Sequence, residues 1–371
     1  MLTLDFPETS YEEWIQQLEK DLKGKPWSDL QWQLGEGILV DPFYHSDNFS
    51  PQRPPLVDQR NTNTWEIGEY IDGSAPDLAN RAILDALEGG AEAIEIHLTQ
   101  PLDSKGLTIL LQRVQLEFIS IHFVEAYAQK QPLEVLQLLK HFVLEQGFDP
   151  AKISGSVALD SAQHESSATL IRWVNQELPG YKVCCINGRG FHQGQSNTAS
   201  ELAAIIQTGV NLLDQLQEHG AKLDEIADQF QFSVAIGTSY FVEIAKLRAL
   251  RILWRNVLQA YEIADKGFEI SVHFAPLTAD TNPNTNLIRA ATQAMSAVIG
   301  GTNRLYVLPS DAAQSEPSTP FSKRIARNVQ HLLRLESHLD KVIDPAAGSY
   351  YIEKLTEELA QKAWTIFQES F

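Results

Sequence analysis

From about residue 75 onward, short apolar runs rich in β-branched residues alternate with longer runs of helical periodicity. This alternation predicts parallel strands joined by crossover helices. The predicted strands are 91–98, 118–125, 153–160, 181–188, 232–238, 268–275, 305–309 and 341–345. Helical patterns fill the gaps, among them 131–146, 198–219, 241–263, 284–299 and 322–337.

Eight such units in succession indicate an α/β chain with a (β/α)8 (TIM) barrel. An open doubly wound sheet is the alternative, but no glycine-rich phosphate-binding turn follows the first predicted strand. We therefore expect residues 61–371 to form the barrel and residues 1–60 to form an N-terminal arm.

Polar residues recur at alternate positions in several predicted strands, as in the pair Glu95 and His97. Alternate residues share one face of a strand, and the face under the helices must be apolar, so the polar face should point into the barrel. The other members of this set are Ser120, His122, Ser154, Ser156, Ser271 and His273. A polar interior suggests water or an extended polar ligand along the axis. Alternatively, these groups satisfy one another across the barrel.

Three phenylalanines, Phe118, Phe123 and Phe274, are expected under the helices, and of these Phe123 and Phe274 have the opposite parity to the neighbouring His122 and His273. The histidines His97, His122 and His273 share no ligand-spaced motif, so no metal site is expected.

The arm differs from the barrel in composition. Residues Tyr11 to Leu22 carry apolar side chains at helical spacing, and the sequence Lys23-Gly24-Lys25-Pro26 stops the pattern. Aromatic residues then stand among glycine and proline: Trp27, Trp32, Phe43 and Tyr44. These rings must pack on something, either on their own barrel or on a partner subunit that the arm wraps.

The formal net charge of −19 is unfavourable for contact with phosphate backbones or anionic lipid, so neither nucleic acid nor a membrane surface is an expected partner. Cys184 and Cys185 are adjacent in an apolar run and point to opposite faces of a strand, which is typical of inert thiols in a reducing compartment. With no basic leader and no membrane-length apolar run, the sequence predicts a cytoplasmic protein.

Three segments resemble the adenosylcobalamin-dependent methylmalonyl-CoA mutase family. They are DPAAGSYYIEKLTEELAQKAW from Asp344, FSKRIARNVQHLLRLES from Phe321, and VAIGTSYFVEIAKLRALRILW from Val234. The segment SYEEWIQQLEKDLKGKPWSDLQW, from Ser10, resembles the family's N-terminal arm.

The resemblance implies a barrel that holds acyl-CoA, with its pantetheine arm along a polar axis. Ser120, His122, Ser154, Ser156, Ser271 and His273 would then be substrate-lining candidates. It also implies a corrin on the C-terminal face of the barrel, carried by a separate flavodoxin-like domain with an Asp-x-His-x-x-Gly motif. That motif does not occur in this sequence, so adenosylcobalamin is expected in the complex but not on a motif of this chain.

Departures from the family pattern point to the small, non-catalytic subunit. Catalytic members carry Arg-Pro-Trp-Thr-Ile-Arg-Gln-Tyr, where this chain has Asn63 and Gly68 at the arginine positions and keeps Tyr70. The Gly-Tyr-His triplet appears as Gly190-Phe191-His192, which leaves His192 and Tyr70 as vestigial catalytic candidates. The segment GGTNRLYVLPSDAA from Gly300 resembles the small subunit's counterpart.

We therefore expect a structural subunit that pairs with a large catalytic mutase subunit. The alternative is an active acyl-CoA mutase barrel that uses a cobalamin domain in trans. Asp344, at the end of the last predicted strand, is expected to cap the turn into the next helix.

Overall fold

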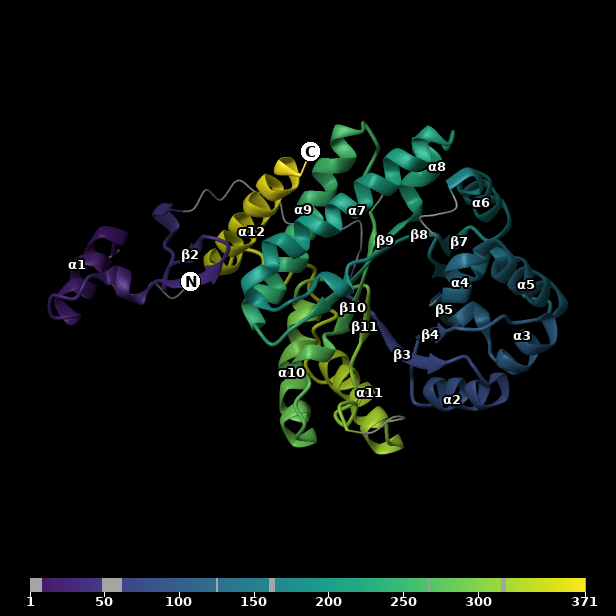
Figure 1. The fold of residues 1–371 in the computed structure, drawn as a ribbon. Helices are drawn as coiled ribbons and strands as arrows, with labels where there is room; N and C mark the ends of the chain where they lie inside the picture. The colour runs from purple at the N-terminus through teal and green to yellow at the C-terminus, as the bar shows by residue number, and fades with distance from the viewer. Residues whose placement is uncertain are drawn as a thin grey trace, which may run out of the picture.

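A parallel β-barrel surrounded by helices forms the body of the molecule (Figure 1). The structure is a computed structural model and describes residues 9–48, 62–124, 126–159, 164–265, 267–314 and 318–370. The barrel strands are β3 (Glu66–Asp72), β4 (Ala93–His97), β5 (Ser120–Val124), β6 (Ser154–Val157), β7 (Gly180–Lys182), β8 (Cys184–Asn187), β9 (Phe230–Ile236), β10 (Glu269–Phe274) and β11 (Arg304–Tyr306).

The ring of strands is closed. β7 and β8 are two halves of one barrel strand, separated only by Val183. β7 pairs with β6 and β8 pairs with β9, while β11 pairs with β3, so every barrel strand has a neighbour on each side. The predicted (β/α)8 barrel is confirmed.

Helices follow the strands in the expected alternation and bury their apolar faces against the barrel. The longer ones are α2 (Pro76–Glu88), α3 (Ser104–Leu110), α5 (Pro132–Glu145), α6 (His164–Glu177), α7 (Thr198–Glu218), α9 (Tyr240–Ala260), α10 (Pro283–Ile299), α11 (Pro320–Leu335) and α12 (Tyr350–Glu369). Short helices α4 (Ala126–Lys130) and α8 (Leu223–Ile226) complete the set. No helix in the described parts of the chain combines the length and the apolarity that a membrane span requires.

Seven of the eight predicted strands overlap observed barrel strands, but the eighth, 341–345, is wrong. Asp344 in that segment has φ 50°, a left-handed backbone that no strand accommodates. The missing strand is β3, the first of the barrel, which the sequence pattern did not reveal. The acidic residues Glu66, Glu69 and Asp72 interrupt its apolar pattern, so the segment did not resemble a buried strand.

Phe123 and Phe274 are buried in the apolar core, as their parity predicted, but the expectation for Phe118 is wrong. Phe118 belongs to a 3-10 turn (Leu116–Phe118) ahead of β5, and its side chain is 80% exposed.

The arm divides into a docked part and a projecting part. Its antiparallel hairpin, β1 (Trp32–Gly35) and β2 (Ile38–Val40), buries Leu34 and Ile38 against the barrel body. The tip residue Glu36 accepts hydrogen bonds from the first-turn N–H groups of Ala199 (2.8 Å) and Ser200 (2.9 Å) in α7. A carboxylate at a helix N-terminus is stabilising, so the hairpin is fastened to its own barrel.

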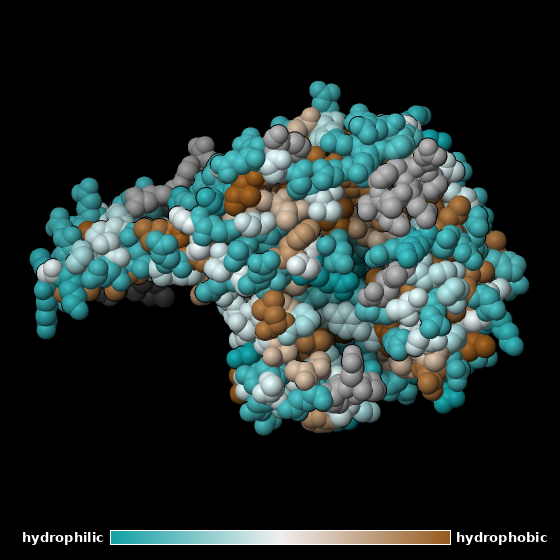
Figure 2. Space-filling view, in the orientation of Figure 1, coloured by the Kyte–Doolittle hydropathy of each residue, from teal (hydrophilic) through white to brown (hydrophobic). Residues whose placement is uncertain are grey.

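The other part of the arm, α1 (Tyr11–Asp21), begins with a capping box between Ser10 and Glu13 and buries no residue. It projects away from the barrel (Figures 1 and 2). The Trp14 ring packs on Phe43 of the same arm, with ring centroids 4.7 Å apart. Of the two alternatives for the aromatic residues, packing on their own barrel is found for the hairpin, whereas α1 does not pack on the barrel and contact with a partner subunit stays a prediction.

Candidate functional site

The lower part of the barrel axis is occupied by the guanidinium of Arg304, a buried residue of β11. Its Nη1 atom donates to Glu269 (2.7 Å) and lies 3.3 Å from a carboxylate oxygen of Glu66. Its Nη2 donates to the side-chain oxygen of Gln231 at 2.6 Å. Burial alone would lower the pKa of Arg304, but the two carboxylates raise it, so the side chain stays charged.

Above this ion pair, His122 bridges two serines. Its Nδ1 lies 2.8 Å from the Ser156 hydroxyl and its Nε2 lies 2.9 Å from the Ser120 hydroxyl. The Ser120 hydroxyl also donates to Glu66, and the Gln231 amide donates to Ser156. Burial, reinforced by the charge of Arg304, holds the pKa of His122 well below its usual value, so the ring is neutral.

On the opposite side of the barrel interior, polar side chains are likewise hydrogen-bonded to one another. The hydroxyls of Ser233 and Ser271 are 2.8 Å apart, and Ser271 lies 3.1 Å from Nε2 of His273. The Nδ1 of His273 faces the Tyr70 hydroxyl at 2.8 Å. The His273 ring stacks on Tyr306, with centroids 4.5 Å apart and the planes 5° from parallel.

Arg189 closes the upper end of the axis. It follows β8 in a 3-10 turn (Arg189–Phe191), and its Nη1 donates to the buried carboxylate of Glu95 at 3.1 Å. Burial alone would raise the pKa of Glu95, but His273, His97 and Arg189 more than offset this and lower it. Glu95 is therefore a carboxylate that neutralises Arg189 inside the barrel.

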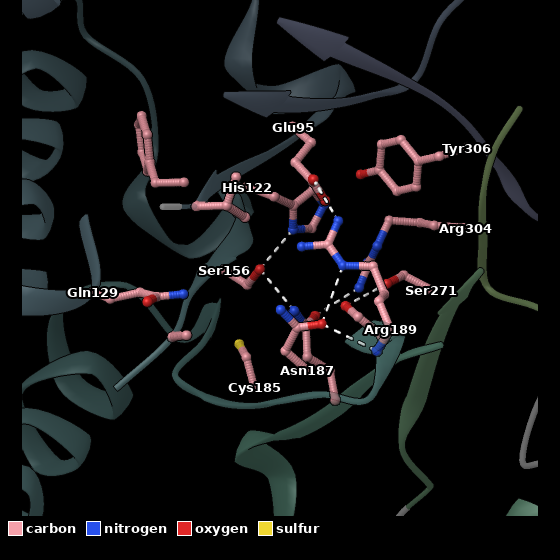
Figure 3. A pocket seen from close by; sticks show the side chains of 15 residues that line it. Glu95, His122, Gln129, Ser156, Cys185, Asn187, Arg189, Ser271, Arg304 and Tyr306 are labelled. Carbon is pink, nitrogen blue, oxygen red and sulfur yellow. Dashed lines mark hydrogen bonds and ion pairs between the residues drawn. The ribbon is translucent and has the colours of Figure 1, made fainter. Parts of the chain in front are cut away.

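These contacts decide between the two interpretations of the polar interior. Figure 3 shows the side chains of Glu95, His122, Ser156, Arg189 and Arg304 pointing toward one another across the axis. The cavity left among them measures only about 30 Å³, on the order of one water molecule. Most of these polar groups therefore bond to one another, with the Tyr306 hydroxyl as an exception, and among the described residues they leave no open channel along the axis.

The structure thus places five of the six predicted lining residues inside the axis: Ser120, His122, Ser156, Ser271 and His273. Ser154 is level with Ser120 but half-buried, and its hydroxyl faces the Ile119 carbonyl at 3.5 Å.

Sequence reasoning missed the residues that fill the axis, namely Glu66, Arg189, Gln231, Arg304 and Tyr306. A signal existed for the pair Arg304 and Tyr306, which alternate along β11 as the serines and histidines do in the other strands.

Gly68 makes this filling possible. A Cβ atom at this position would come within 2.5 Å of the Tyr306 ring. The ring therefore occupies the space that any side chain at position 68 would need. The catalytic members that this chain resembles have an arginine at this position. Here the Tyr306 ring fills the space that the arginine side chain would need.

His192 lies apart from the axis in a buried ion cluster. Its Nδ1 is 2.9 Å from Glu201 of α7, and Glu201 pairs with Lys246 of α9 at 3.0 Å. Lys246 also pairs with Glu243 at 2.7 Å and donates to the Ala235 carbonyl at 2.6 Å. The cluster joins α7, α9 and the end of β9, and His192 lines neither the axial cavity nor the mouth cavity described next.

Asp344, which we expected to cap the turn into the next helix, forms a buried ion pair with α9 instead. Its carboxylate pairs with the buried Arg248 of α9, which also donates to Glu353 of α12 at 2.7 Å. Asp344 therefore fastens the segment before α12 to α9.

A second, larger cavity of about 740 Å³ opens at the mouth of the barrel, where the carboxyl ends of the strands meet. Its floor includes Tyr70, His273 and Arg189, and Lys323 and Arg327 of α11 stand at its side. The mouth of a (β/α)8 barrel is where such folds bind ligands.

The fold and interior define the chain as a (β/α)8 barrel with a polar, filled axis. The family model of methylmalonyl-CoA mutase matches residues 102–370, and the chain belongs to this family. It is 34% identical to the methylmalonyl-CoA mutase small subunit of Porphyromonas gingivalis, over 98% of this chain and 63% of that protein.

Identity to the methylmalonyl-CoA mutase of Cereibacter sphaeroides is 30%, over 96% of this chain and 57% of that protein. Identity to the methylmalonyl-CoA mutase large subunit of Streptomyces virginiae is 28%, over 98% of this chain and 56% of that protein. The chain therefore spans about three-fifths of the length of these relatives.

The family implies a cobalamin cofactor, and His273 at the barrel mouth has no free ring nitrogen with which to ligate its cobalt. Both ring nitrogens of His273 are engaged, by Tyr70 and by Ser271. The Nε2 of His97 faces the Glu95 carboxylate at 3.3 Å. The described residues also form no cluster that could hold a metal ion.

Proposed function

We propose that this chain is the barrel region of a small, non-catalytic subunit of an adenosylcobalamin-dependent methylmalonyl-CoA mutase. The large subunit would interconvert methylmalonyl-CoA and succinyl-CoA and would carry the cofactor chemistry. The filled axis carries this proposal, because a pantetheine arm has no path past Arg304, Tyr306 and Arg189. The name of the Porphyromonas gingivalis relative supports the same role.

The vestigial catalytic candidates also support a structural role. His192 is locked in an ion cluster with Glu201 and Lys246, away from both cavities. Tyr70 is bonded to His273, and burial raises its pKa well above the usual range for a tyrosine. The alternative, an active mutase barrel with a cobalamin domain in trans, would need the axis that Arg304, Tyr306 and Arg189 fill.

The projecting helix α1 is the surface that we assign to the large subunit. It presents Trp14, Ile15 and Leu18 on one face, only partly covered by the arm itself. Aromatic anchors of this kind carry much of the energy at protein interfaces. A cytoplasmic location is part of the proposal, since Cys184 and Cys185 are both free thiols.

Replacing Trp14 by alanine should weaken association with the large subunit by about thirtyfold, because an anchor residue contributes roughly 2 kcal/mol or more. Sedimentation of the two purified subunits at graded concentrations measures this. The matched control is Gln16→Ala on the opposite, exposed side of the same helix, which should leave association unchanged. Equal association of Trp14→Ala and the natural chain would contradict the proposed partner surface.

A further inference from the structure

The mouth cavity has a composition that the proposed subunit role does not use. At about 740 Å³ it has the size of a small-molecule site, and part of its wall is apolar. The apolar side chains that line it are Ala235, Phe274, Val307, Leu308, Pro309 and Ala326. An apolar wall with a few charged groups is the usual make-up of a site for an organic ligand.

Not all of the charged groups that line the cavity are paired with one another. Glu69 is paired with Arg327, so neither offers its full charge to a ligand. Lys323, in the first turn of α11, lines the cavity and has no carboxylate within salt-bridge distance among the described residues. Asp72 is exposed at the rim and accepts a hydrogen bond from the Ser74 N–H at 2.9 Å.

Arg189 supplies a second donor at the floor. Its Nη1 and Nε atoms are engaged by Glu95 and Asn187, at 3.1 Å in each case. Its Nη2 makes no hydrogen bond within the described residues, and the side chain lines the mouth cavity as well as the axial one. A guanidinium held rigidly by two partners, with one nitrogen left over, is well prepared to bind an anionic oxygen.

From these features we propose that the mouth cavity binds a compact organic anion. The ligand would have a carboxylate or phosphate head held by Lys323 and Arg189 and an apolar body against Phe274, Val307 and Leu308. Because the floor is closed by Tyr70, His273 and Arg189, the ligand enters and leaves by the mouth and carries no chain into the axis. Binding here is independent of the proposed subunit role, which rests on the axis below.

Calorimetric titration of the full chain with four probes tests this. Hexanoate and hexyl phosphate share the apolar body and differ in the anionic head, 1-hexanol lacks the charge, and acetate lacks the body. The better of the two six-carbon anions should bind at least tenfold more tightly than 1-hexanol or acetate. The anion with the higher affinity identifies the preferred head group as a carboxylate or a phosphate.

Three variants separate the proposed contacts from a general effect of charge. Lys323→Met should weaken the better anion about tenfold, whereas Arg324→Met, one position along and exposed, should not. Arg189→Gln is combined with Glu95→Gln so that no buried charge is left unpaired, and this double variant should also weaken binding. Equal affinities for hexanol and both anions, or equal effects of Lys323→Met and Arg324→Met, would overturn the proposal.

Discussion

Replacing Arg304 by methionine is expected to lower the free energy of unfolding by about 3 kcal/mol. Methionine matches the length of the arginine stem but cannot neutralise Glu66 and Glu269, so two carboxylates would face each other at the lower end of the axis. Breaking a fully buried ion pair costs roughly 3–5 kcal/mol. We expect the lower end of that range, since each carboxylate side chain keeps about a third of its exposure (36% and 37%).

Urea denaturation followed by circular dichroism measures this difference. The control is Arg81→Met, whose guanidinium is 76% exposed and lies 3.9 Å from Asp77. An exposed pair of this kind is worth less than about 1 kcal/mol, so the control should remain close to the natural chain. If both variants lose the same small amount, Arg304 does not hold the interior together.

Acidification from pH 6.5 toward pH 5 is expected to destabilise the barrel through its two interior histidines. Burial, with smaller effects of nearby charges, lowers the pKa of His273 to about 3 and that of His122 well below its usual value. An unfolded chain protonates the same rings near pH 6.5. Below that pH the unfolded state binds more protons than the folded state, so stability falls as pH falls.

The expected slope is up to about 1.4 kcal/mol per pH unit for each histidine. Glu95, whose pKa is lowered, adds to the loss only below its unfolded value near 4.3, so it does not affect this window. His122→Gln should reduce the slope by about one proton. His141→Gln, at a ring that is 62% exposed, should leave it unchanged. Equal slopes for the natural chain and His122→Gln would show that His122 titrates normally in the folded protein.

The polar interior could be predicted because a strand has a period of two. Ser120 and His122 lie on one face of β5, and Phe123 lies on the other. What the pattern could not show is that these groups bond to one another, since the partners are far apart along the chain. Tyr70 and His273, for example, are 203 residues apart and meet only because β3 and β10 both border β11.

The missed strand has a similar cause. The acidic residues of β3 are tolerated because Arg304 neutralises Glu66 and Arg327 neutralises Glu69, and both arginines lie more than 200 residues away. The false strand at 341–345 has the reverse cause, because its apolar run gave no sign that Asp344 would turn to a left-handed backbone and pair with Arg248. Both errors therefore have one cause, namely ion pairs between residues that are far apart in the sequence, which a local pattern does not reveal.

The filled axis is tested most directly by titrating the chain with propionyl-CoA, first alone and then in complex with the large subunit. We expect no saturable binding to the isolated chain and no mutase turnover when adenosylcobalamin and methylmalonyl-CoA are supplied. In the complex, we expect one propionyl-CoA per pair of subunits. Saturable one-to-one binding to the isolated chain, or turnover of about 1 per second, which is ordinary for an enzyme, would contradict a non-catalytic barrel.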